Sequence, residues 1–130
     1  MGYTFDEAQF LEYVEEIMTG IDTNIYNGSA PSSAIFPYGV MEIKQPFQNE
    51  GSKTKLMIYI NFWDYEGNRL RDLLALVKKF KLALHKLCCE NENMNLNFNH
   101  ESTFEIPTGD SKSKRRESKY IVEYYNKNIT

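Results

Sequence analysis

Apolar residues near the N-terminus recur at the three- and four-residue spacing of an amphipathic helix. The positions that share this face are Phe10, Leu11, Val14, Ile17 and Met18. Thr4 and Glu7 have the spacing of a capping box, which satisfies the first backbone amides of a helix. Gly20 suits the left-handed residue that commonly ends one. The pattern predicts a helix over residues 5–19.

Two segments with a period of two follow, and each predicts a β-strand. Residues 21–37, which precede them, are rich in Asn, Gly, Ser, Ala and Pro and predict a long connection. In the first strand, over residues 38–44, Met41 and Ile43 share one face. In the second strand, over residues 55–63, one face is wholly apolar and consists of Leu56, Ile58, Ile60 and Phe62. The sequence QNEGSK between the strands supplies hairpin-turn residues.

A leucine-rich segment then gives the clearest helical stripe in the chain. Its apolar positions are Leu70, Leu73, Leu74, Val77, Phe80, Leu84 and Leu87. Most of its Lys and Arg residues lie elsewhere on the helix surface, and Asn68 is a suitable N-cap. We predict a long amphipathic helix over residues 69–88 that packs on one face of the sheet.

The C-terminal third returns to strand-like patterns. Leu96 and Phe98 lie in an Asn-rich, weakly strand-like segment, and residues 103–106 and 119–125 are predicted strands. The sequence GDSKSKRRES before the last strand predicts a polar, charged hairpin tip. The order of elements predicts a single α+β domain over residues 1–130, with a mostly antiparallel sheet of about four strands.

Composition narrows the class of protein. The chain has 130 residues, 42% hydrophobic and 25% charged, with a formal net charge of −3, and so lacks the basic surplus of a dedicated nucleic-acid binder. No apolar run reaches the ~18 residues of a membrane span, and we see no signal-peptide pattern. Cys88 and Cys89 are adjacent and cannot form a disulfide framework, so we expect reduced thiols in a cytoplasm.

Candidate catalytic and metal chemistry is sparse. His85, Cys88 and Cys89 would lie together on a helix, with His100 nearby in sequence, and zinc accepts such ligands. However, no C-x-x-C pair is present, and Cys88 extends the apolar stripe as a core residue would, so we expect neither metal nor cofactor. The chain has no G-x-S-x-G elbow or P-loop, and nothing places a nucleophile beside its acidic pairs. We therefore expect no enzymatic activity.

A basic run at the predicted hairpin tip suggests a nucleic-acid contact. The candidate contact residues are Lys112, Lys114, Arg115 and Arg116. Such cations neutralise phosphates without reading sequence. No aromatic residue falls within the run for base stacking, and Asp110 and Glu117 offset part of its charge, so a solvated hairpin tip is the alternative interpretation.

Aromatic residues are numerous for one modest core: the chain has nine Tyr, eight Phe and one Trp. Tyr and Trp suit surfaces that are buried on assembly, because each combines a large apolar area with one polar atom. Strand alternation places Tyr120 and Tyr124 on one side of the last strand and Tyr125 on the other. We predict self-association or a partner contact through six residues: Met57, Tyr59, Trp63, Tyr120, Tyr124 and Tyr125.

The order of these segments resembles the tail terminator, or tail-to-head joining, proteins of long-tailed bacteriophages. The resemblance rests on the segments FPYGVMEI, KLMIYINFWD, GNRLRDLLALVKKFKLAL and SKYIVEYY. In that family, a Pro-Tyr strand start, a strand ending in an aromatic-Asp pair, a short Gly turn and a long amphipathic helix follow in this order. The corresponding features here are Pro37-Tyr38, Trp63-Asp64, Gly67 and residues 70–87.

The resemblance implies a structural virion protein without catalytic residues, made in the bacterial cytoplasm and located at the head–tail junction. Like the family, it would form a hexameric ring, cap the tail tube protein and contact the head connector protein. DNA would only pass through its lumen, and no membrane would be involved. The residues alone leave two alternatives open: a small cytoplasmic nucleic-acid-associated protein that uses residues 112–116, and an enzyme subunit whose site needs a partner.

Overall fold

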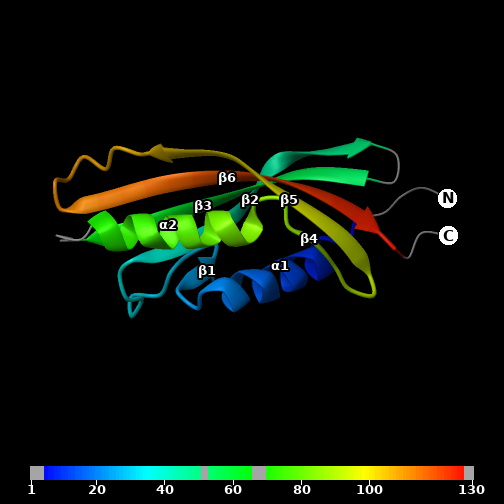
Figure 1. Cartoon of the computed structure of the whole chain (residues 1–130), viewed down its shortest axis with the longest axis horizontal. Coiled ribbons are helices and arrows are strands. Elements are labelled where there is room, and N and C mark those ends of the chain that lie inside the picture. Colours follow the sequence, from blue (N-terminus) through cyan, green and yellow to red (C-terminus); the bar gives the residue numbers. More distant parts are fainter. Residues whose placement is uncertain (1–4, 51–52, 66–69, 128–130) are drawn as a thin grey trace.

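Six strands form one curled sheet, and two helices lie against one of its faces (Figure 1). The elements are α1 (Glu7–Ile21), β1 (Ile25–Asn27), β2 (Tyr38–Glu50), β3 (Lys53–Tyr65), α2 (Leu70–Leu84), β4 (Cys88–Glu90), β5 (Met94–Glu105) and β6 (Ser113–Asn126). The computed structural model describes residues 5–50, 53–65 and 70–127. The strand order is β1-β2-β3-β6-β5-β4, with β1 and β2 parallel and the other neighbours antiparallel. The predicted α+β class is confirmed, with six strands instead of about four.

The first helix begins at an Asp6 cap. Asp6 Oδ1 accepts a hydrogen bond from the Gln9 amide at 3.0 Å, which is the usual geometry of an N-cap. The predicted cap, Thr4, lies outside the described residues. The helix continues through Gly20 and ends at Ile21, so the prediction that Gly20 stops it is wrong.

The core lies between the inner face of the sheet and the two helices. Its fully buried side chains include Phe10, Val14 and Met18 of α1, Leu73, Phe80 and Leu84 of α2, and Leu56, Ile58, Ile60 and Phe62 of β3. The predicted apolar face of residues 55–63 is therefore confirmed. Burial of each such side chain contributes roughly 1.5–3 kcal/mol to stability. The apolar faces of the strands and helices therefore determine which face of the sheet the helices cover.

The leucine-striped helix is shorter than predicted. It ends at Leu84 and not at residue 88, because Lys86 adopts a left-handed backbone (φ 62°) and the chain then enters β4. Leu87 packs against the core from beyond the helix end. Asn68, the predicted cap, lies outside the described residues.

Two short edge strands were missed by sequence reasoning. β1 lies inside the predicted long connection and pairs with residues 39–41 of β2. β4 begins at Cys88, the last residue of the predicted helix. Each has three residues, which is too few for a period of two to be recognised. Their pairing with β2 and β5 creates them, and this pairing is not visible in the local sequence.

The two C-terminal strands are longer than predicted. β5 is continuous from Met94 to Glu105, with a register shift between His100 and Ser102, where the sequence suggested two separate pieces. β6 begins at Ser113, within the predicted hairpin tip. The tip is consequently short, and most of the basic run belongs to a strand.

Candidate interaction face

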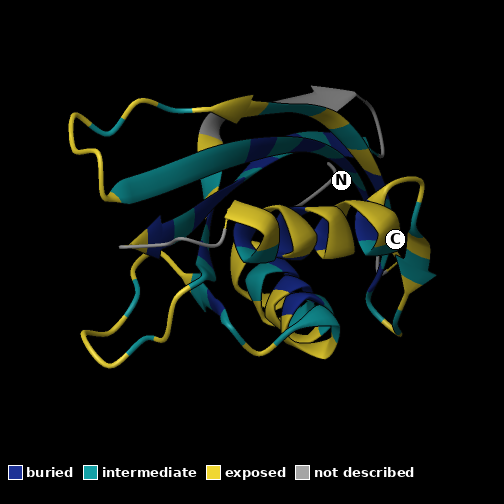
Figure 2. Cartoon of the chain, turned by 60° about the vertical axis from the view of Figure 1, so that its left-hand side comes forward, coloured by how far each residue is buried: buried dark blue, intermediate teal, exposed yellow. Residues whose placement is uncertain are grey.

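The face of the sheet opposite the helices carries most of the residues predicted for contact. Figure 2 shows the sheet arching over both helices, and buried residues alternate with half-buried ones along β3 and β6. We call the open surface the outer face. It comprises Tyr38, Val40, Glu42 and Lys44 of β2, Lys53, Lys55, Met57, Tyr59, Asn61 and Trp63 of β3, and Arg115, Glu117, Lys119, Ile121, Glu123 and Tyr125 of β6.

Tyr59 lies at the middle of the outer face between two lysines. Lys44 Nζ is 4.9 Å and Lys119 Nζ is 5.9 Å from the centroid of its ring. Ammonium groups at such distances are attracted by the negative face of an aromatic ring. Lys119 Nζ also lies 3.5 Å from Glu101 Oε2. The Tyr59 ring is thus framed by cations on both neighbouring strands.

Trp63 lies under a guanidinium group that is held in place by two further contacts. The Arg115 Cζ atom is 5.0 Å from the centroid of the Trp63 ring. Arg115 Nε donates a hydrogen bond to Asn61 Oδ1 at 2.8 Å, and Arg115 Nη2 lies 3.6 Å from Glu117 Oε2. Because Asn61 is itself buried, these contacts fix the orientation of both the guanidinium and the indole.

An aromatic cluster that sequence reasoning missed continues the outer face beyond Trp63. The Phe36 ring lies 5.0 Å from the Tyr38 ring and 6.0 Å from the Tyr65 ring, and Tyr26 contacts Tyr38 edge-on at 5.9 Å. Phe36 and Tyr65 are each 42% exposed, and Ile35 beside them is 72% exposed. The signal available in the sequence was the alternation along residues 38–44, which puts Tyr38 on the same side of the strand as Val40. The pairing of Tyr38 with Trp63 is visible only in the structure.

Two of the six predicted contact residues do not lie on this surface. Tyr120 and Tyr124 are fully buried, because the register of β6 turns them toward the helices. The Tyr124 ring packs edge-on against Phe5 at 4.9 Å and against Phe10 at 5.9 Å. Both residues belong to the core, which corrects the prediction. Met57, Tyr59, Trp63 and Tyr125 remain, each half-buried.

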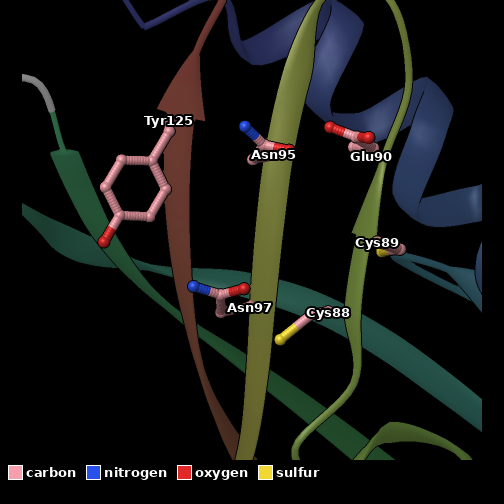
Figure 3. A pocket seen from close by; sticks show the side chains of 6 residues that line it. All are labelled: Cys88, Cys89, Glu90, Asn95, Asn97 and Tyr125. Carbon is pink, nitrogen blue, oxygen red and sulfur yellow. The ribbon is translucent and has the colours of Figure 1, made fainter.

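An open hollow of about 470 Å³ adjoins Tyr125 at the β4 edge of the sheet. Figure 3 shows Asn95 and Asn97 of β5 between Tyr125 and Cys88. Cys89 lies on the other side of β4, where burial raises the pKa of its thiol. Glu90 also lines the hollow, and its Oε2 atom lies 2.6 Å from Lys127 Nζ, so this carboxylate is held in an ion pair at the edge of the sheet.

The histidines and cysteines weighed as zinc ligands do not converge. The adjacent cysteines lie on opposite sides of β4, and His85 Nδ1 instead accepts a hydrogen bond from the His100 amide at 3.1 Å. His100 Nε2 lies 2.6 Å from Thr103 Oγ1. Among residues 5–50, 53–65 and 70–127, no three His, Cys, Asp or Glu side chains form a group that could hold a metal ion.

The four predicted cationic contact residues do not form one loop patch. Lys112 lies at the hairpin tip, whereas Lys114, Arg115 and Arg116 lie in β6. Lys114 Nζ donates to the Ser111 carbonyl at 3.1 Å. Arg115 and Arg116 point to opposite faces, and the Arg116 Nη1 atom lies 3.5 Å from Glu105 Oε2 without making a hydrogen bond. The four cations therefore belong to the hairpin tip and to both faces of the first residues of β6.

Mild acid is expected to destabilise the protein through His100. Burial, and then nearby Lys81 and His85, lower the pKa of His100 below its ordinary value. The unfolded chain therefore binds this proton more readily than the folded chain. The contribution of the imidazole to stability is fully present above about pH 6.5, and it is lost as the pH falls through the lower pKa of the folded state. Urea unfolding should give a smaller free energy at about pH 5.5 than at about pH 7.5. His100→Gln should reduce the difference, and equal wild-type values would contradict the expectation.

Comparisons with known proteins do not place the chain in a family. No protein-family model matches it, and no curated protein matches it. In the described part of the chain, neither helix has the length and apolarity needed to cross a membrane.

Proposed function

We propose that this chain is a structural protein of a bacteriophage or prophage particle, which forms a ring, caps the tail tube and joins it to the head connector. The observation that carries the proposal is the outer face. Its aromatic rings are only half-buried, although both helices already cover the opposite side of the sheet. Covering a sheet face that is rich in aromatic rings with a partner lowers the free energy of the assembly.

The order of elements supports the same proposal. Tyr38 begins β2 directly after Pro37, and Trp63 and Asp64 precede the last residue of β3. The amphipathic helix α2 follows from Leu70. Gly67 lies outside the described residues. Strand start, aromatic-Asp strand end and helix thus follow each other as in the tail terminator family.

The geometry of the outer face fits a stacking role. Arg115 is already fixed over Trp63 by Asn61, so little side-chain freedom is lost when a partner binds. Aromatic residues and Arg are enriched at protein interfaces relative to other surfaces. The tail tube protein is the partner that we assign to this face, and the function requires no catalytic group.

Deletion of the gene from its parent phage or prophage tests the proposal. We expect induced lysates to contain filled heads without attached tails, together with tails of uncontrolled length, as seen by electron microscopy. A plasmid copy of the gene should restore complete particles. Normal tailed particles after deletion, or a gene that lies outside any phage gene cluster, would refute the proposed function.

A further inference from the structure

The two helices carry opposite net charges. α1 contains four Glu and no Lys or Arg, a net charge of −4. α2 contains four basic residues and one Asp, a net charge of +3. An ion pair joins the two helical regions, between Lys79 Nζ and the Asp22 Oδ2 atom just after α1, at 3.1 Å.

The side of α2 that faces away from the core forms a mixed basic and apolar ridge. Arg71, Leu74, Lys78 and Leu82 follow one another at three- and four-residue spacing, and we call them the basic ridge. Leu74 is 43% exposed and Leu82 is 72% exposed. Exposed leucines between cations predict that a partner with apolar and acidic groups covers this helix.

The outward side of α1 has the complementary character. Glu12, Glu15 and Glu16 are exposed and make up what we call the acidic ridge, beside the half-buried apolar residues Leu11 and Tyr13. Within residues 5–50, 53–65 and 70–127, no ion pair involves the acidic ridge or the two cations of the basic ridge. Figure 2 shows exposed positions along both helices.

We propose that the basic ridge docks the acidic ridge of a second copy of this chain, and that this contact repeats around the ring. The inference rests on the proposed function, because a ring is the assembly that it explains. Charge complementarity selects the occupant: α2 against α2, or α1 against α1, would place like charges together, which is strongly unfavourable at an interface. A contact between two different surfaces generates a ring when the rotation that it repeats closes on itself.

Charge reversal tests the contact. One variant reverses the acidic ridge (Glu12→Lys with Glu16→Lys), and the second reverses the basic ridge (Arg71→Glu with Lys78→Glu). All four positions are exposed helix sites, so thermal melts monitored by circular dichroism should stay close to wild type. Analytical ultracentrifugation of the full chain should show association weakened at least about tenfold in each variant, and weakened by salt in the wild type.

Two rescue experiments serve as matched controls. An equimolar mixture of the two variants should associate again, because each reversed ridge then meets its complement in alternating copies. The chain that carries all four substitutions should also associate, since its ridges remain complementary and its net charge equals that of the wild type. Association of either single-ridge variant at wild-type strength, or failure of both rescues, would overturn the inference.

Complementation of the gene deletion separates this inference from the proposed function. If deletion prevents head–tail joining but both single-ridge variants complement it fully, the ridge contact is wrong and the function stands. If deletion leaves particles normal, the function is wrong, and the ultracentrifugation result alone decides the contact. A wild-type chain that stays monomeric in solution and is dispensable for particles overturns both.

Discussion

Tyr124→Ala is expected to destabilise the protein by about 3–5 kcal/mol, whereas Tyr125→Ala, one residue further along β6, should cost less than about 1 kcal/mol. Tyr124 is fully buried, and its ring fills the space between Phe5 and Phe10. Its removal leaves a cavity that a closely packed interior closes only in part. Tyr125 is half-buried on the outer face, where solvent replaces the lost ring.

Urea unfolding of the two variants measures this difference directly. Tyr124→Phe is the matched control and should retain most of the wild-type free energy of unfolding, because it keeps the ring. Similar losses for Tyr124→Ala and Tyr125→Ala would show that the register of β6 differs from the one described. That result would also return Tyr124 to the set of contact residues on the surface.

The sequence predicts the main elements of this fold because their apolar periods are local. The buried face can be read from the period of two in residues 55–63 and from the leucine stripe of α2. The end of α2 is different, since it depends on the left-handed backbone of Lys86 and on the pairing of β4 with β5. The ends of helices and strands at such places are determined by tertiary contacts, which are not present in any short window of the sequence.

For the predicted contact residues, too, local sequence predicts the alternation of side chains but not the pairing of the strands. Alternation correctly separates Tyr124 from Tyr125, but it cannot say which of the two faces the helices. That depends on the pairing of Ile58 with Tyr120 across β3 and β6, sixty-two residues apart in sequence. A one-residue slip in this register would exchange the buried and outer sets. Arg115 and Arg116 lie on opposite faces because β6 already begins at Ser113, and this early start depends on the pairing of Ser113 with Tyr65.

Under the proposed function, the combination of Tyr59→Ala and Trp63→Ala is expected to abolish attachment of the proposed ring to the tail tube while the fold persists. Both rings are half-buried in the isolated subunit, and each already has cations beside it. Aromatic residues at the centre of an interface commonly contribute at least about 2 kcal/mol each, or roughly thirtyfold in affinity. The loss of the cation contacts within the subunit should cost only about 0.5–1 kcal/mol at each ring.

Complementation of the gene deletion provides the measurement, with head–tail joining scored by electron microscopy and by infectious titre. The matched variant, Tyr59→Phe with Trp63→Phe, keeps aromatic rings beside Lys44 and Arg115 and should complement close to wild type. Thermal melts of the purified variants separate loss of contact from loss of fold. Full complementation by the double alanine variant would exclude the outer face as the tube contact, because no partner would then depend on its two central rings.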